Sequence, residues 1–331
     1  MGRLAAQALI AGGPERYGGC RDDGGTVVKL GLAALRQPVS AADLADTRAF
    51  YATRVGGVGP RSATELAAVR AARAVDPQAP TRARSEIIEV DGHRIPIRIL
   101  MPDSGHPTGI HLHLHGGGFY MDSASRHDAQ NARRADALDA VVIGVDYRLA
   151  PESPWPAAPD DCAAVASWLI ETGTERFGTT ALTLGGMSAG ATLAMTTLLR
   201  LRDAGVVSEV DGVVLEAGSY DLSAHTPSGA TIADEYFIEA YVGHVTDRTV
   251  ADISPIFGDL RGLPLVLVVI GEDDVVLADN LAMLARLTAA GNDVDLRLYP
   301  AAPHGFTMHD TPIGRQAVDD VDTWLRARLA R

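Results

Sequence analysis

From residue 85 onward, short apolar runs alternate with longer stretches of helical spacing, and this alternation restricts the fold more than any other feature of the chain. The runs read EIIEV, RIPIRIL, GIHLHLH, VVIGVDY, ALTLGG, GVVLEAG, PLVLVVIG and VDLRLYP. Apolar spacing between and after the later runs predicts helices over 158–172, 189–204, 277–290 and 313–330. Strands that are apolar on both faces and alternate with helices are typical of a mostly parallel sheet covered on both sides. The sequence therefore predicts an α/β fold here.

Two segments fall outside this alternation. Residues 1–82 are rich in Ala and Arg with helix-like spacing, and Ser40 followed by Asp43 three residues later is typical of a helix start. Residues 222–252 are polar and interrupt the alternation with partly helical sequence. We therefore expect a helical accessory segment at the N-terminus and a second, shorter insertion late in the sheet.

Composition restricts the partners and the compartment. The chain has 331 residues, of which 47% are hydrophobic, enough for one large domain with a well-buried core. Its 29 basic and 42 acidic side chains give a formal charge of −13 without a basic cluster, which argues against nucleic acid as a partner. Cys20 and Cys162 are too few for a disulfide framework or a four-thiolate metal site, so a reducing cytoplasm fits best.

Other classes of mechanism and location are disfavoured as well. Lys29 is the only lysine and is remote from every motif described below, which argues against Schiff-base and Ser-Lys chemistry. The N-terminal run LAAQALIAG is short and is followed by PERYGGC rather than by a cleavage site of small residues, so it is a weak signal-peptide candidate. No stretch reaches the roughly 18 to 20 apolar residues that a spanning helix needs. We expect a soluble protein without a membrane span.

The segment GGMSAG, residues 185–190, contains the clearest catalytic signal. It follows the predicted strand ALTLGG and precedes the predicted helix ATLAMTTLLRL, and strand-turn-helix is the context that G-x-S-x-G requires. Gly186 and Gly190 leave room for the backbone to double back, so that Ser188 stands exposed at the tip of the strand. Ser188 is then a candidate nucleophile, and the alternative is an ordinary helix N-cap.

A serine nucleophile needs a base, and the base needs an orienting carboxylate. After PLVLVVIG comes a loop with four acidic side chains, at Glu272, Asp273, Asp274 and Asp279. After VDLRLYP comes AAPHGF, which places His304 in the corresponding loop one strand later. The loops at the carboxyl ends of parallel strands open onto the same crevice. The alternatives are a solvated helix start for the acids and a turn position for the histidine.

The segment HLHLHGGGFY, residues 111–120, permits two hypotheses. His111, His113 and His115 alternate, so in a strand they share one face and could bind a metal ion. The glycines favour a different function, because a glycine run lets backbone N–H groups approach a substrate and stabilise an oxyanion. We favour the second hypothesis, with the N–H groups of Gly117, Gly118 and Ala189 as donors and with no metal.

These motifs resemble those of the hormone-sensitive-lipase-like branch of the α/β-hydrolases, the bacterial esterases with an HGGGF loop. The matching pieces lie within about residues 82–331: HGGGF at 115–119, DYRLAPESPWPAAPDD at 146–161, GMSAG at 186–190, SP at 254–255, GEDD at 271–274 and PHGF at 303–306. Two positions depart from the family pattern, because the family usually has Asp or Thr at position 187 and Gly at position 191, where this chain has Met187 and Ala191. The acid loop also departs, because it reads Asp274-Val-Val-Leu-Ala-Asp279 rather than D-P-L-x-D.

The resemblance implies an eight-stranded α/β-hydrolase domain, residues 83–221 and 253–331, with a helical cap formed by residues 1–82 and 222–252. It implies a serine carboxylesterase without a cofactor, acting on a small ester through Ser188, His304 and Asp274. Asp274 is the candidate acid because its spacing from Gly271 matches that of the family. A homodimer through the last strand, VDLRLYP, is also implied.

Two alternatives stay open. One is an amide, formamide or carbamate hydrolase that uses the same triad. The other is a ligand-binding receptor on this scaffold, similar to the plant gibberellin receptors, which resemble the family but lack a working histidine. The presence of His304 in a PHGF context argues against the receptor. The cap segments carry few large apolar side chains, so we expect short to medium acyl esters as substrates.

Overall fold

The computed structural model describes residues 31–54, 59–76, 79–90 and 92–330. The chain divides into two units, residues 1–34 and 35–331. Of the first unit only residues 31–34 are described, where the short helix α1 (Leu32–Leu35) begins. All other helices and strands of the described residues belong to the second unit.

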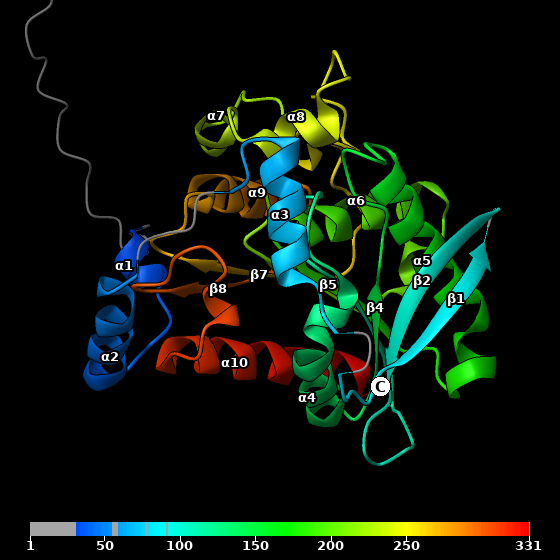
Figure 1. Cartoon of the computed structure of the whole chain (residues 1–331). Helices are drawn as coiled ribbons and strands as arrows, with labels where there is room; N and C mark the ends of the chain where they lie inside the picture. The colour runs from blue at the N-terminus through cyan, green and yellow to red at the C-terminus, as the bar shows by residue number, and fades with distance from the viewer. Residues whose placement is uncertain (1–30, 55–58, 77–78, 91, 331) are drawn as a thin grey trace, which may run out of the picture. The chain divides into compact units, whose positions relative to one another are not determined.

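Eight strands of the described residues form one sheet in the order β1-β2-β4-β3-β5-β6-β7-β8 (Figure 1). They are β1 (Arg84–Val90), β2 (His93–Leu100), β3 (Ile110–Leu114), β4 (Val141–Val145), β5 (Leu182–Met187), β6 (Gly212–Glu216), β7 (Val266–Gly271) and β8 (Val294–Tyr299). The pairs β1–β2 and β2–β4 are antiparallel, and all other neighbouring strands are parallel. The predicted mostly parallel, eight-stranded sheet is confirmed.

Burial along each strand follows its place in the sheet. Every residue of the inner strands β3, β4, β6 and β7 is buried, as expected for parallel strands with helices on both faces. The first two strands form an antiparallel hairpin at one edge, and their burial alternates because only one face of the hairpin packs on the domain. The runs that are apolar on both faces therefore form the central strands of the sheet, and the runs that mix apolar and polar residues form the strands at its edges.

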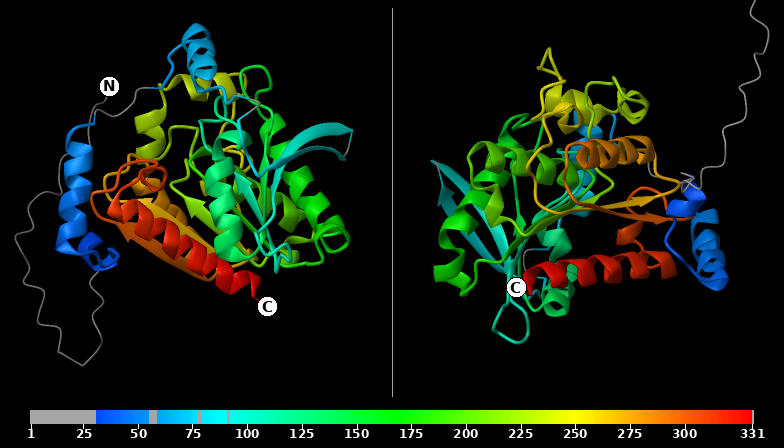
Figure 2. Two further views of the ribbon diagram at one scale, coloured as in Figure 1. Left: turned by 60° about the horizontal axis from the view of Figure 1, so that its bottom comes forward. Right: turned by 180° about the vertical axis from the view of Figure 1, so that it is seen from behind.

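Helices cover both faces of the sheet (Figure 2). On one face α4 (Asp128–Leu138) packs against α10 (Pro312–Leu329). On the other, α5 (Ala157–Phe177) packs against α6 (Ala189–Asp203), and α9 (Leu277–Ala289) contacts β7 and β8. The four predicted helices correspond to α5, α6, α9 and α10, with ends that differ by a few residues.

Four further helices come from the two segments that interrupt the alternation: α2 (Ala41–Ala52), α3 (Ala63–Arg73), α7 (Pro227–Ile232) and α8 (Tyr236–Val242). Ser40 caps α2 by accepting the Asp43 N–H at 3.0 Å, as its sequence predicts. The helix α2 packs against α10, whereas α3, α7 and α8 border a cavity at the carboxyl ends of the strands. Short 3₁₀ turns complete the chain: η1 (Ala124–His127), η2 (Val207–Glu209), η3 (Pro255–Phe257) and η4 (Phe306–Met308).

The free edge of β8 is partly occupied by the chain itself. Arg36 forms a parallel bridge with Leu298, and the Gln37 N–H donates to the Leu298 carbonyl at 2.7 Å.

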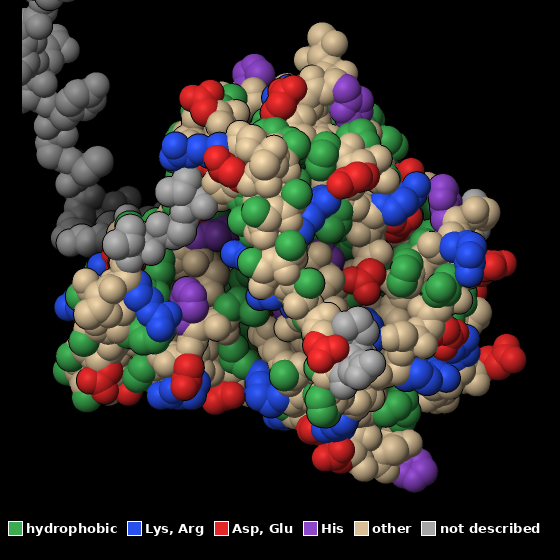
Figure 3. Space-filling view, viewed as in Figure 1, with side chains coloured by type: hydrophobic (Ala, Val, Ile, Leu, Met, Phe, Trp, Pro, Cys, Tyr) green, Lys and Arg blue, Asp and Glu red, His purple; other side chains and the backbone are tan. Residues whose placement is uncertain are grey.

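Among the helices that the structure describes, none has the length and the apolar run needed to cross a bilayer. On the face of the molecule seen in Figure 3, basic and acidic side chains are interspersed rather than gathered by sign.

Candidate active site

Ser188 occupies a sharp turn between β5 and α6. Its backbone has φ 55° and ψ −121°, a conformation that non-glycine residues adopt only where the surrounding structure enforces it. A Cβ at Gly186 would lie 2.5 Å from the Gly190 carbonyl carbon, and one at Gly190 would lie 2.0 Å from the Leu114 oxygen. Only glycine fits at either position. The predicted strand-turn-helix setting of Ser188 is therefore present, and its side chain makes no N-cap hydrogen bond.

Ser188, His304 and Asp274 lie together in the structure. As predicted, His304 lies between the other two and contacts both. Ser188 Oγ lies 2.9 Å from His304 Nε2, and His304 Nδ1 lies 3.0 Å from both carboxylate oxygens of Asp274. A carboxylate can only accept hydrogen bonds, so Nδ1 carries the proton and Nε2 accepts from the serine hydroxyl. The Asp274 side chain is fully buried, while 37% of the His304 side chain is exposed toward the cavity.

Of the four acidic candidates, only Asp274 contacts His304. Asp273 is exposed and lies in a turn in which the Asp274 N–H donates to the Gly271 carbonyl at 3.3 Å, so the loop is not extended as the sequence suggested. Glu272 forms an ion pair with Arg36. Asp279 lies in the first turn of α9 and accepts hydrogen bonds from Thr226 and Ser228, so it connects α9 to α7.

The predicted oxyanion donors face the same cavity as Ser188. The backbone of Gly117 has φ 105° and that of Gly118 has φ 61°, in the positive-φ region that glycine adopts most readily. A Cβ at Gly117 would lie 2.2 Å from the Met121 carbonyl oxygen. Among the hydrogen bonds of the described residues, none is donated by the N–H of Gly117, Gly118 or Ala189. Ala189 begins α6, so the positive end of the helix dipole adds to this set of donors.

The cavity has a volume of about 400 Å³. Apolar side chains form most of its walls, and three charged side chains, Arg73, Asp122 and Glu235, lie among them. The residues of the predicted triad and oxyanion hole that line it are Gly117, Gly118, Ser188, Ala189 and His304. The apolar walls are formed by Phe119, Tyr120, Met121, Met187, Ile232, Phe237, Val275 and Val276. The cavity has room for a small acyl group beside Ser188.

The three alternating histidines are buried and bonded within the protein. His111 Nδ1 lies 3.1 Å from Thr183 Oγ1, His113 Nδ1 lies 3.2 Å from Asn131 Nδ2, and His115 Nδ1 donates to the Gly116 carbonyl at 2.7 Å. Burial lowers the pKa of His115 to about 4 and the pKa values of His111 and His113 well below the ordinary range. Within the described part of the chain, no three His, Cys, Asp or Glu side chains converge as a metal ion would require.

A buried ionic cluster beneath Ser188 was not identified in the sequence. The Ser188 N–H donates to the Glu216 carbonyl at 2.8 Å, and the Glu216 carboxyl lies 3.9 Å from Arg134. Arg134 also pairs with Asp322 at 3.0 Å. Burial raises the pKa of Glu216, although the Arg134 charge opposes that shift. The signal in the sequence is a lone acidic residue in the apolar run GVVLEAG.

Comparison with known proteins finds relatives of this chain. A family model described as alpha/beta hydrolase fold matches residues 111–308. An acetyl-hydrolase of Streptomyces hygroscopicus is 33% identical over 226 residues, which are 65% of this chain and 74% of that protein. The carboxylic ester hydrolase LipN of Mycobacterium tuberculosis is 30% identical over 255 residues, which are 72% of this chain and 68% of LipN.

A solved structure agrees over most of the chain. An esterase from the bacterial hormone-sensitive lipase family superposes with a TM-score of 0.69 at 26% identity, covering 88% of this chain and all of that one. The match of the family model and the coverage of these relatives lead to one conclusion. The chain belongs to the α/β-hydrolase family, in its hormone-sensitive-lipase-like branch of carboxylic ester hydrolases.

Proposed function

We propose that the chain is a serine carboxylesterase that hydrolyses short to medium acyl esters through an acyl-enzyme, without a cofactor. The observation that supports this most directly is the chain of contacts from Ser188 Oγ to His304 Nε2, at 2.9 Å, and on to Asp274. A serine hydroxyl is a weak nucleophile by itself, and a positioned imidazole makes it effective by accepting its proton as the bond to carbon forms.

In acylation, Ser188 Oγ attacks the ester carbonyl carbon and its proton passes to His304 Nε2. The carbonyl oxygen becomes an oxyanion, which the N–H groups of Gly117, Gly118 and Ala189 stabilise. Asp274 keeps Nδ1 protonated and stabilises the imidazolium that forms. Collapse of the tetrahedral intermediate breaks the bond to the alcohol oxygen, which takes the proton from Nε2 and leaves.

In deacylation, a water molecule takes the place of the alcohol. His304 Nε2 accepts a proton from the water as its oxygen attacks the acyl carbon, and the oxyanion forms again in the same place. The intermediate collapses, the bond to Ser188 Oγ breaks, and His304 returns the proton to the serine. The products are the acid and the free enzyme.

The cavity supports a preference for small acyl groups. Its volume is about 400 Å³, and Tyr120 and Phe237 stand on its wall where α8 approaches the oxyanion loop. We propose that α3, α7 and α8 act as the cap of this pocket. In a series of p-nitrophenyl esters, kcat/KM should be highest between acetate and hexanoate. A maximum at ten or more acyl carbons would contradict the preference.

The function is tested by covalent labelling. A fluorophosphonate probe should modify the protein, and peptide mapping should place the adduct on Ser188. A parallel assay with matched p-nitrophenyl butyrate and butyryl p-nitroanilide should show far faster turnover of the ester. Faster turnover of the amide would favour the amidase alternative, and tight ligand binding without labelling or turnover would favour the receptor.

We also propose a cytoplasmic location and a homodimer that pairs through β8. Because Arg36 and Gln37 already occupy the edge at Leu298, this pairing would use the portion of the strand nearer Val294. Light scattering after size exclusion should give twice the chain mass, and Leu296→Pro, which places a proline in that strand, should reduce it to the mass of one chain. A single-chain mass for the wild type would exclude the dimer.

A further inference from the structure

Arginine side chains from outside the loop contact the oxyanion loop, residues 115–122. Arg70, near the end of α3, donates from Nε to the Tyr120 carbonyl at 2.8 Å. The same guanidinium donates from Nη2 to the Ala150 carbonyl at 2.6 Å and pairs through Nη1 with Glu152 at 2.7 Å. One side chain of α3 therefore connects the loop to the chain that follows β4.

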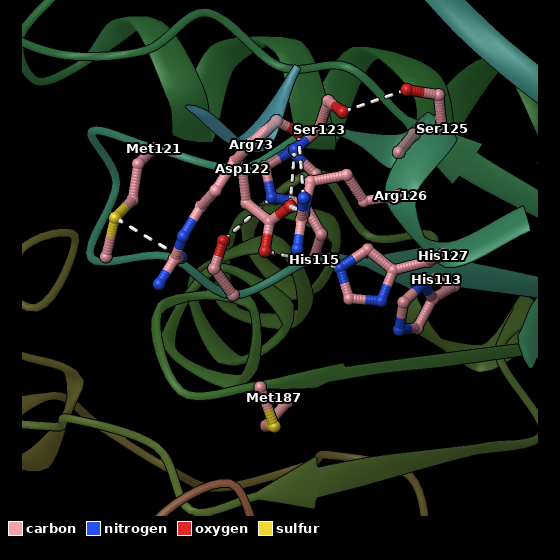
Figure 4. A network of polar contacts seen from close by, with 12 residues as sticks. Arg73, His113, His115, Met121, Asp122, Ser123, Ser125, Arg126, His127 and Met187 are labelled. Carbon is pink, nitrogen blue, oxygen red and sulfur yellow. Dashed lines mark hydrogen bonds and ion pairs between the residues drawn. The ribbon is translucent and has the colours of Figure 1, made fainter. Parts of the chain in front are cut away.

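Asp122 is the last residue of the loop, two residues beyond the Arg70 contact (Figure 4). Its backbone has φ 81°, which disfavours a residue with a side chain, so other contacts must stabilise it. Its Oδ1 accepts the Ser123 N–H at 3.0 Å and Arg126 Nε at 2.8 Å, and its Oδ2 lies 3.7 Å from His127 Nε2. Burial by itself raises the pKa of Asp122, but His127, His115 and the Ser123 N–H together lower it, to about 2. The carboxylate is therefore charged at neutral pH.

Arg126 connects this end of the loop to α3 as well. While its Nε bonds Asp122, its Nη1 donates to the carbonyl of Arg73, the last residue of α3, at 2.8 Å. Arg73 in turn reaches the loop, with Nη1 at 3.6 Å from Met121 Sδ, and lines the cavity. The helix that borders the pocket and the loop that carries the oxyanion donors are thus joined at three successive residues, Tyr120, Met121 and Asp122, which lie directly after the donor glycines.

The loop needs such support because its own bonds are few. Gly117, Gly118, Phe119 and Asp122 all have positive φ. The N–H groups of Tyr120 and Met121 both donate to the Gly117 carbonyl, at 3.3 and 3.0 Å. A glycine-rich segment in this conformation has many alternatives of similar energy. Oxyanion donors contribute to catalysis only when they are already aimed at the place where charge develops.

We propose that Arg70 and the Asp122–Arg126 pair are positioning residues for the oxyanion hole, so that docking of α3 and alignment of the Gly117 and Gly118 N–H groups occur together. This inference rests on the proposed esterase function. Helix α3 then contributes to the transition state as well as to the shape of the pocket, although it contains none of the triad.

The test uses the full chain with Arg70→Gln and Asp122→Asn, and with Glu152→Gln as the matched control. Asn keeps an acceptor for Ser123 and tolerates positive φ but loses the charge that pairs with Arg126. Glu152→Gln removes the exposed partner of Arg70 and leaves its contact with Tyr120. For each variant we would measure kcat and KM for p-nitrophenyl butyrate per fluorophosphonate-labelled site, Ki for butylboronic acid, and Tm.

Arg70→Gln and Asp122→Asn should each lower kcat about tenfold or more and change KM less than about threefold, because the lost contacts matter only in the transition state. Butylboronic acid forms a tetrahedral adduct with serine, so its Ki should rise by a similar factor. Arg70→Lys, which keeps one donor, should recover part of both losses, and Glu152→Gln should keep kcat within about twofold.

Unchanged kcat per labelled site and unchanged boronate Ki in both variants would overturn the positioning role, as would an equal loss in Glu152→Gln. A fall in Tm with no change in kcat or in the boronate Ki would show that these residues stabilise the fold without positioning the oxyanion donors. If the wild type neither hydrolyses esters nor reacts with the fluorophosphonate, the proposed function fails first, and this inference fails with it.

Discussion

At the scale of single residues, the proposed chemistry depends on one hydroxyl, one imidazole and one carboxylate held within hydrogen-bond distance. The carboxylate and the imidazole each have a near neighbour of the same type that lacks their contacts. Asp273 precedes Asp274 and is exposed, and His309 is bonded to Tyr51 rather than to the serine. Substituting a triad residue and its neighbour in turn therefore tests whether activity depends on the hydrogen bonds of the triad or only on a residue of that type nearby.

Ser188→Ala should leave the fold intact and lower kcat by roughly 10⁴-fold or more, the scale seen when a triad member is lost. Circular dichroism and Tm serve as the controls for folding. If the variant still reacted with a fluorophosphonate and kept most of its activity, another residue would have to be the nucleophile.

The acid loop allows a comparison within one segment. Asp274→Asn should lower kcat by about 10³ to 10⁴, because the amide can select the wrong His304 tautomer and cannot balance the imidazolium charge. Asp273→Asn, at an exposed position, should cost less than about tenfold. Asp279→Asn should also cost less than about tenfold, although it should lower Tm, because Asp279 is buried against Thr226 and Ser228. A severe loss in Asp273→Asn with a nearly silent Asp274→Asn would exclude Asp274 as the acid.

At the scale of elements, the site is assembled where three strands end. The strand β5 leads into Ser188, β7 leads into the Asp274 loop and β8 leads into the His304 loop. The strand β3 leads into the oxyanion loop on the other side of β5. Because parallel strands end on the same side of a sheet, four loops distant in sequence surround one cavity.

Gly117→Ala tests the geometry of the oxyanion loop. A Cβ there would lie 2.2 Å from the Met121 carbonyl oxygen, and the backbone φ of 105° is strained for alanine. The loop must therefore shift, and its N–H groups no longer point at the oxyanion. We expect kcat to fall about 10²-fold, near the cost of losing one oxyanion donor. Gly178→Ala is the matched control, because Gly178 has φ 76° at the end of α5 but open space around it. It should lower Tm and leave kcat unchanged; an equal loss of kcat would contradict the role of the loop.

The strand β3 provides a test of the metal hypothesis. Among the described residues, no three His, Cys, Asp or Glu side chains converge as a metal ion would require, so prolonged treatment with EDTA should leave the hydrolysis of p-nitrophenyl butyrate unchanged. Loss of activity under EDTA with recovery on adding zinc would restore the metal hypothesis.

At the scale of the folded domain, His111, His113 and His115 connect stability to pH. Their pKa values in the folded protein lie below the pKa of a histidine in an unfolded chain, about 6.5. Below that pH the unfolded chain therefore binds more protons than the folded protein. Their contribution to stability is complete above about pH 6.5 and is lost as the pH falls toward the folded values, about 4 for His115. Asp146 and Glu216, whose pKa values burial raises, act in the opposite sense.

His113→Asn isolates one of these contributions. Urea unfolding of the wild type between pH 7.5 and 5 should show the free energy of unfolding decreasing as the pH falls. Each buried histidine contributes up to about 1.4 kcal/mol per pH unit in this range. The variant should show a slope smaller by about that amount. An identical slope in the two proteins would mean that His113 titrates normally in the folded state.

The sequence by itself determined the features that depend on neighbours along the chain. Apolar runs on both faces predicted the inner strands. The glycines of GGMSAG and HGGGF predicted the turn at Ser188 and the oxyanion loop, because a Cβ at Gly117, Gly186 or Gly190 would meet main-chain atoms. The placement of the Ser188, Asp274 and His304 loops at the carboxyl ends of strands followed from the same pattern, whereas the order of the strands in the sheet did not. Steric exclusion acts over a few ångströms, so it restricts which residue types can occupy these positions, and glycines in the sequence indicate where the backbone is crowded.

The tertiary structure alone decided which distant side chains meet. It placed α2 against α10 and α3 beside the cavity, although both helices come from one Ala- and Arg-rich segment. It brought Arg70 to Tyr120 across 50 residues and left Glu216 beside Arg134 in the interior. Arginines and carboxylates are common on any surface, and their partners depend on how helices pack rather than on residue type. For this reason the residues of the predicted triad could be named from the sequence, while the contacts that hold the oxyanion loop could not.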